Sequence, residues 1–504
     1  MRSKRSIYNL IAALGSQLIL LVLGLIIPRL ALTNYGSETN GYMNLVSQVY
    51  AYIALLEAGL GTAEIQALYG PISAGAQCEI SQIIQVSKRY YSKLAATYGA
   101  VVLVVALVLP IVVQSELSPW EMTIYFVLFG LPRILNFWLT QPMRNLLTVE
   151  GKNYIDTMTN LCVSLGSTGV RIWLLLNDVG LIPLQIAYTL CNLSEVLFYY
   201  VYTRKKYHWI DKKAIGDPSL LRQRDAFFVQ QICTLIFRCT DILLLSVFHG
   251  LKATSVYAVY ALIYNAINSI VHTVFSSTHF ILGQIYHESL ERYQKLSRIY
   301  EMGFLWLVFV LFTAAYVLAV PFVRLYTKGI TDADYLVAAI PLLMTIGNCF
   351  FASRTVNESL LNLSYHAKQT LWQIVTEAAL NLGLSLILVK PFGIPGVLLG
   401  TCIAAAFRLI VITIYTNRNV LQTPAWNSFW LYGVNFTTLG VIIFFRSRFD
   451  VVLTSYFDFM KAGVVTTLFI AVVYSAVNVI AHFQLVRGAA IGAWGRLQQF
   501  RHRQ

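Results

Sequence analysis

Charge is what this 504-residue sequence has least of: Asp, Glu, Lys and Arg make up 12% of it, against 57% hydrophobic residues and a mean hydropathy of +0.64. No polar stretch between the apolar runs is long enough to form a soluble domain. These two absences exclude a chain of ordinary soluble domains. Apolar runs of about 20 residues recur along the whole length, as helices that cross a hydrocarbon core of roughly 30 Å require. The sequence therefore predicts an all-α, multi-pass membrane protein.

Enzyme motifs are also missing. The sequence contains no H-E-x-x-H, no G-x-S-x-G, no phosphate-binding loop and no glycine-rich dinucleotide turn, which argues against an ATPase or a membrane hydrolase. Its seven cysteines never stand in C-x-x-C spacing, so the sequence predicts neither a disulfide framework nor a zinc site. We predict that the chain is not an enzyme and holds no cofactor.

The net charge of +14 comes from short clusters of Lys and Arg that separate the apolar runs. Clusters in this position contact lipid headgroups, so membrane lipids are predicted partners and nucleic acid is not. With both termini in the cytoplasm, 24 of the 37 Lys and Arg residues fall on the inner side and 8 on the outer side. This bias predicts that orientation.

Apolar runs and charged breaks together predict fourteen transmembrane helices. The outer connections between them, such as 115–119 and 177–180, are too short to hold a catalytic domain. The predicted helices span residues 8–32, 41–68, 91–114, 119–143, 156–177, 179–203, 225–249, 253–283, 302–326, 334–360, 368–389, 394–416, 427–446 and 461–485.

The chain also repeats itself. The motif G-L-I-P at 180–183 returns as G-I-P at 393–395, with an offset of 213, and the leucine pair at 146–147 returns at 360–361. A shared offset predicts two pseudo-symmetric six-helix lobes around a central cavity, in parallel orientation because six spans return the chain to its starting side. The predicted parts are an N-lobe over 1–207, a basic cytoplasmic linker over 208–224, a C-lobe over 225–420, and helices 13 and 14 with a basic cytoplasmic tail over 421–504.

Ionisable residues inside predicted membrane helices are candidate functional residues. Arg133 and Arg171 have no carboxylate within four residues, and a guanidinium group matches the geometry of phosphate, so both are predicted to bind an anion. Arg408 stands nearer the cytoplasmic end of its helix, where its side chain could simply reach the membrane surface.

Two further pairs of charges can neutralise themselves along one helix. Arg238 and Asp241 are three residues apart, and Arg354 and Glu358 are four apart. Structural pairing and a functional role both stay open for these residues, and Arg238 is a further candidate for the anion site.

Two other helices carry polar stripes. Ser47, Tyr50, Glu57, Gly61 and Glu64 fall on one face of the helix over 41–68, where either a packed, neutral glutamate or a direct role in coupling would fit. The helix over 253–283 presents a second stripe, which we interpret as the wall of a water-filled cavity suited to sugar rings. This stripe includes Tyr257, Tyr264, Asn268 and His272.

The segment from Pro28 to Gly61 carries a family resemblance. It reads P-R at 28–29, Y-G at 35–36, a glycine at 41 and L-L-E-A-G at 55–59. In this order and spacing it resembles the first hairpin of the polysaccharide transporters, the lipid-linked oligosaccharide flippases of the multidrug/oligosaccharidyl-lipid/polysaccharide exporter superfamily. The resemblance implies translocation of an undecaprenyl-pyrophosphate-linked oligosaccharide across the bacterial cytoplasmic membrane for O-antigen, capsule or exopolysaccharide synthesis. It also adds Arg29 to the predicted pyrophosphate contacts.

Further implications of the resemblance concern partners and energy. Polysaccharide polymerase and glycosyltransferases become expected functional partners, and coupling to a proton or sodium gradient stays open. A cation-coupled multidrug exporter of the same superfamily is the alternative, because Glu57, Glu64 and Glu377 could contact a cationic substrate. A membrane glycan polymerase or ligase is less consistent with the sequence, since such enzymes need a sizeable outer loop.

Overall fold

The computed structural model describes residues 2–57, 60–113, 115–150, 153–211, 240–364, 369–446 and 455–483, together with residues 214, 366 and 487. All regular structure in these ranges is helical. The described residues fall into two compact units, one formed by 1–258 and 329–333 and the other by 259–328 and 334–504. The predicted all-α fold class is therefore observed, whereas most of the predicted linker over 208–224 lies outside the described residues.

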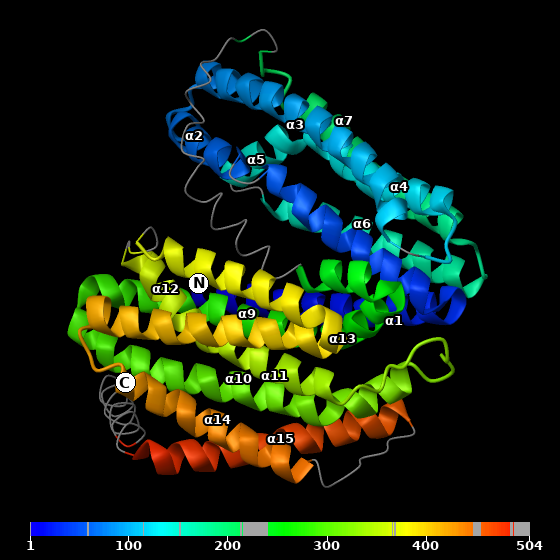
Figure 1. Cartoon of the computed structure of the whole chain (residues 1–504). Helices are drawn as coiled ribbons and strands as arrows, with labels where there is room; N and C mark the ends of the chain where they lie inside the picture. The colour runs from blue at the N-terminus through cyan, green and yellow to red at the C-terminus, as the bar shows by residue number, and fades with distance from the viewer. Residues whose placement is uncertain are drawn as a thin grey trace. The chain divides into compact units, whose positions relative to one another are not determined.

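The first unit contains the helices that are blue to cyan-green in Figure 1. Helices α3 and α4 pack together, α7 packs on α4 and α6, and α2 packs on α5. The elements are α1 (Arg2–Ile53), η1 (Ala54–Glu57), α2 (Leu60–Ala74), α3 (Gln77–Val112), α4 (Pro119–Leu139), α5 (Gln141–Val149), α6 (Asn153–Leu176) and α7 (Leu181–Lys206), followed by the start of α9 (Gly250–Glu288).

The second unit contains the rest of α9 and the yellow-green to red helices of Figure 1. Here α10 packs on α11, α14 and α15, and α11 packs on α13. The elements after α9 are α10 (Leu290–Tyr326), α11 (Ala339–Ser353), α12 (Thr355–Leu363), α13 (Leu371–Thr416), η3 (Asn417–Leu421), α14 (Trp426–Arg446) and α15 (Tyr456–Ala481).

Ten helices among the described residues are long and apolar enough to cross a membrane. Several expose large apolar side chains in continuous stripes, which lipid can cover favourably. On α15 the stripe follows helical spacing and comprises Val464, Val465, Leu468, Phe469 and Val472, all more than half exposed. These exposed faces agree with a multi-pass membrane protein.

Several predicted helix boundaries need correction. The helix predicted over 41–68 is interrupted, because α1 ends at Ile53 and the turn η1 separates it from α2. The predicted single stripe from Ser47 to Glu64 is therefore broken. The helices predicted over 119–143 and 334–360 each break near their end, at Thr140 and Arg354. Most of the helix predicted over 225–249 lies outside the described residues.

The offset between the two halves recurs in the backbone. Helices α5 and α12 each have nine residues and begin 214 residues apart. Gly36 and Gly250, also 214 apart, both adopt a left-handed conformation, with φ of 80° and 78°, which glycine adopts without steric cost. The leucine pairs at 146–147 and 360–361 are both buried. Each half thus places a short helix after a break and anchors it by the same two leucines.

A loop after α10 docks on the bend of α1 within the first unit. The backbone N–H and hydroxyl of Ser37 donate hydrogen bonds of 2.7 and 2.6 Å to the Asp332 carboxylate. Burial raises the pKa of Asp332, but the Ser37 hydrogen bonds and the nearby Lys252 charge outweigh it, so the pKa lies below its ordinary value. The carboxylate is therefore held in its charged form at neutral pH.

Candidate functional site

Two residues that the sequence assigned to different roles form an ion pair. Arg133 on α4 lies 3.5 Å from Glu57 at the end of η1, measured from Nη2 to Oε2. The Arg133 side chain is 53% exposed and the Glu57 side chain 21%. Because a charged guanidinium group is costly in hydrocarbon, its exposed part must face water or a polar ligand. The interruption of the helix before α2 is what brings Glu57 to this position.

The other predicted arginines are placed differently. Arg171 on α6 stacks over the ring of Tyr188, with its guanidinium carbon 4.6 Å from the ring centre, and its buried Nε has no hydrogen-bond partner among the described residues. Arg29 lies half-buried on α1, which packs on α6. Arg238 lies outside the described residues. The structure therefore places three of the four predicted anion-binding arginines in the first unit.

Glu64 is fully buried on α2. Its Oε2 accepts a hydrogen bond of 2.6 Å from Asn145 on α5, and Asn145 also donates to the Tyr91 hydroxyl at 3.2 Å. Gly61 is one turn away, and a Cβ atom there would lie 3.5 Å from the same hydroxyl. Glu64 thus sits in a packed, hydrogen-bonded interface between α2, α3 and α5.

The polar stripe on α9 contacts neighbouring segments. Tyr257 donates to Asp241 at 3.1 Å, Tyr264 donates to the carbonyl of Pro341 at 2.8 Å, and Asn268 donates to the Asn348 side chain at 2.6 Å. Tyr264 is also buried, with its ring 6.2 Å from that of Phe312 and nearly parallel to it. His272 is the exposed member of the stripe.

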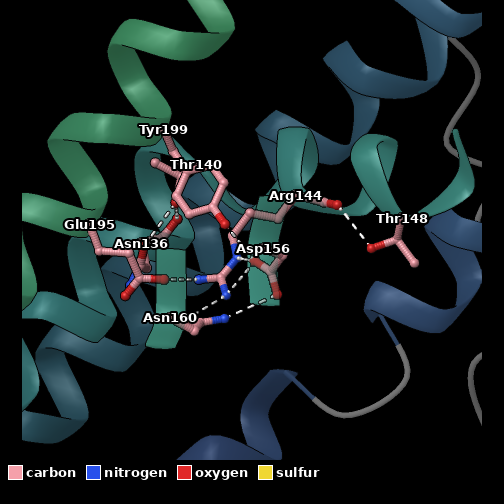
Figure 2. A network of polar contacts seen from close by, with 8 residues as sticks. All are labelled: Asn136, Thr140, Arg144, Thr148, Asp156, Asn160, Glu195 and Tyr199. Atoms are coloured by element: carbon pink, nitrogen blue, oxygen red, sulfur yellow. Dashed lines mark hydrogen bonds and ion pairs between the residues drawn. The ribbon is translucent and has the colours of Figure 1, made fainter. Parts of the chain in front are cut away.

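A polar network that the sequence did not single out joins α5, α6 and α7. Figure 2 shows Arg144 at its centre, with Nε donating to Asp156 at 2.8 Å and Nη1 donating to Glu195 at 2.9 Å. Asp156 also accepts hydrogen bonds from Tyr199 at 2.7 Å and from Asn160 at 3.1 Å. Residues from α6 and α7 thus fix a guanidinium group that belongs to α5.

The break before α5 positions Arg144. Thr140, at the break, donates to the Asn136 side chain at 2.9 Å, and Thr148 donates to the backbone carbonyl of Arg144 (Figure 2). Pro142 in the first turn of α5 favours a new helix start, because proline lacks the N–H that a continuous helix requires. The network holds two carboxylates and one guanidinium group, a formal excess of one negative charge that a proton or a small cation could neutralise.

The second unit contains an ionic cluster on the corresponding helices. Arg354, at the break before α12, pairs with Glu358 at 3.0 Å and with Glu377 on α13. Arg408, further along α13, lies 3.8 Å from Glu377 and donates to Gln373 at 2.6 Å. Arg408 is only 2% exposed, so the expectation that it reaches the membrane surface is wrong: a buried carboxylate and an amide bind it inside the unit.

The two clusters carry opposite charges at equivalent positions. Arg144 on α5 corresponds to Glu358 on α12 at an offset of 214, and Glu195 corresponds to Arg408 at the offset of 213 that relates Gly180 to Gly393. Each cluster connects a short helix to the long helices that follow it. The scaffold is duplicated, while the charge is inverted at these two positions and the other charged residues of each cluster have uncharged counterparts.

Sequence reasoning missed Asp156 and Glu195, and it treated Glu377 only as a possible drug contact. Their partners lie 12, 51 and 23 residues away along the chain, beyond the reach of helical spacing. The repeat offered one usable signal, because it aligns Arg144 with Glu358 and thereby marks both as charges near a helix break.

Comparison with known proteins shows the fold. No family model matches the sequence. No curated protein matches it either. Among solved structures, the lipid II flippase MurJ in an inward closed conformation aligns with 94% of this chain and 99% of its own, at 14% identity and a TM-score of 0.64. An inward-facing multidrug resistance MATE transporter of the MOP superfamily aligns with 80% of this chain and 95% of its own, at 17% identity and a TM-score of 0.61. A eukaryotic MATE transporter aligns with 86% of this chain and 99% of its own, at 11% identity and a TM-score of 0.53. The chain therefore has the fold of MOP-superfamily transporters.

Proposed function

We propose that the protein is a flippase that translocates undecaprenyl-pyrophosphate-linked oligosaccharide repeat units across the bacterial cytoplasmic membrane by alternating access. This transport would serve surface polysaccharide synthesis. The proposed architecture has fourteen transmembrane spans, two six-helix lobes over 1–207 and 225–420, and both termini in the cytoplasm. The alignment with a lipid II flippase over 94% of the chain supports a lipid-linked substrate, since MATE exporters align over 80 to 88%.

The half-exposed Arg133 beside Glu57 is the observation that carries this proposal. The guanidinium group also lies over the Phe137 ring, with its carbon 5.6 Å from the ring centre, but a stacked ring takes up no N–H donor. One ion pair of 3.5 Å therefore leaves most of the five guanidinium N–H donors available to phosphate oxygens. A pyrophosphate carries more negative charge than one carboxylate, so it can replace Glu57 as the partner of Arg133. Glu57 would then hold Arg133 in place between transport cycles, and Arg171 and Arg29 would add positive charge along the pyrophosphate path.

Binding of undecaprenyl pyrophosphate to purified protein tests the proposal. Arg133→Ala should weaken binding roughly tenfold, the loss of one charge-assisted hydrogen bond, and Arg133→Lys should weaken it less because the charge remains. Glu57→Gln should bind at least as tightly as the wild type. Arg89→Ala, which removes an exposed arginine in the polar first half of α3, is the matched control.

The alternative, a cation-coupled multidrug exporter, predicts the opposite effects for the Arg133 and Glu57 variants. Export of a cationic drug would depend on Glu57 and would tolerate Arg133→Ala. If Arg133→Ala and Arg171→Ala proteins insert normally and still support full glycan export in cells, these arginines are structural and the proposed site is wrong.

The excess negative charge around Arg144 supports coupling to a proton or sodium gradient. In vesicles, Glu195→Gln should reduce the response of transport to an imposed gradient while substrate binding persists. Equal responses in Glu195→Gln and wild-type protein would remove this network from the coupling mechanism.

A further inference from the structure

A cavity of about 810 Å³ opens where α10, α14 and α15 meet in the second unit. Figure 1 shows α14 and α15 side by side, and the cavity lies at the end where α14 begins and α15 finishes. Its volume is within the range of small-molecule sites. The lining residues are Arg298 and Glu301 on α10, residues 426–428 and 430–431 at the start of α14, and residues 480–483 at the end of α15.

The cavity presents one positive and one negative group. Arg298 and Glu301 are three residues apart and therefore lie on the same face of α10. Neither makes an ion pair within 4.0 Å with any described residue. Tyr432 donates a hydrogen bond of 2.7 Å to Oε1 of Glu301. Oε2 accepts no hydrogen bond from any described residue and is not enclosed, although the residue as a whole is only 8% exposed. An accessible carboxylate oxygen beside a guanidinium group can accept a hydrogen bond from a cationic partner, which stabilises the charged form of the carboxylate.

Aromatic and imidazole groups complete the lining. The side chains of Trp426 and Trp430 are 71% and 51% exposed, and indoles are common at a membrane–water interface. The faces of their rings can attract an ammonium group. The buried Nε2 of His482 has no hydrogen-bond partner among the described residues.

We propose that this cavity binds the headgroup of a zwitterionic phospholipid that carries a primary amine. Its phosphate binds Arg298 and its ammonium group binds Glu301 and the two indoles. The exposed apolar faces of α14 and α15 accommodate the acyl chains. Under the predicted topology, this end of the helices lies in the cytoplasmic leaflet. The site goes beyond the proposed transport function, and it differs chemically from a pyrophosphate site, because a pyrophosphate offers no cation to Glu301 and the carboxylate would repel it.

Native mass spectrometry of the full chain tests the proposal with phosphatidylethanolamine, phosphatidylcholine and phosphatidylglycerol of identical acyl chains. The ethanolamine lipid should be retained roughly tenfold better than the other two, because only its headgroup pairs with both charges by charge-assisted hydrogen bonds. Choline cannot donate a hydrogen bond to Glu301, and the glycerol headgroup carries no cation. Preference for phosphatidylglycerol, or equal retention of all three lipids, would overturn the proposal.

Variants separate the two halves of the site. Glu301→Gln should lower ethanolamine-lipid retention to the level of the choline lipid, and it keeps an acceptor for Tyr432, so folding should survive. Arg298→Ala should lower the retention of all three lipids, because each of them carries the phosphate that Arg298 binds. Lys295→Ala removes an exposed cation one turn away on α10 and should change nothing. Trp426→Ala alters an exposed side chain and should lower retention severalfold without affecting the core. Unchanged lipid selectivity in Glu301→Gln would refute the assigned role of the carboxylate.

Discussion

Replacing Arg144 with alanine should destabilise the first unit. In the wild type, one guanidinium group on α5 pairs with Asp156 on α6 at 2.8 Å and with Glu195 on α7 at 2.9 Å. Removing it leaves two carboxylates near each other with side-chain exposures of only 23% and 9%. Loss of one partner from a buried ion pair costs about 3–5 kcal/mol, and the partial exposure of Asp156 places the expected loss of unfolding free energy at about 3 kcal/mol.

Denaturant unfolding of the purified protein in detergent measures this loss, with Arg89→Ala as a surface control. The double variant Arg144→Ala/Glu195→Gln should recover part of the stability, because one orphaned carboxylate becomes a neutral amide. The double-mutant cycle should therefore show an interaction free energy of about 1–3 kcal/mol. If Arg144→Ala unfolds within about 0.5 kcal/mol of the wild type, as surface substitutions do, or if the two effects simply add, the network does not join the three helices.

Three further predictions concern other parts of the molecule. Gly41→Ala should sharply reduce the yield of folded protein, because the added Cβ would lie 2.0 Å from a backbone carbonyl oxygen of α9, whereas Gly440→Ala meets open space and should express normally in the same size-exclusion assay. Asp332→Asn should lower thermal stability at pH 7. The difference from wild type should vanish as the pH falls below the ordinary range of an aspartate pKa, because a group with a lowered pKa contributes stability only above that range. A difference that stays constant down to acid pH would contradict the role of the charge. A cysteine introduced at Lys212, which lies outside the described residues, should resist impermeant thiol reagents in intact cells, and labelling there would reverse the predicted topology.

The sequence by itself determined the class of the protein and its internal periodicity. Apolar runs long enough to span a bilayer predict helices because no other open backbone arrangement satisfies its hydrogen bonds in lipid. The leucine pairs at 146–147 and 360–361 indicate a repeat from the sequence alone, and the backbone shows the same offset at Gly36 and Gly250. The sequence also identified Arg133 and Glu57 as charges at membrane depth.

Only the tertiary structure decided which charges meet. Arg133 and Glu57 are 76 residues apart, and they pair because α1 ends at Ile53 and the chain turns before α2. No proline or cluster of charges in the sequence predicts this break. Arg408 is bound inside its unit by Glu377 because α13 folds back at Gly393, where φ is 58°. The energy of a membrane charge depends on the group opposite it, and that group is supplied by another helix, so local spacing reveals the candidates but not their partners.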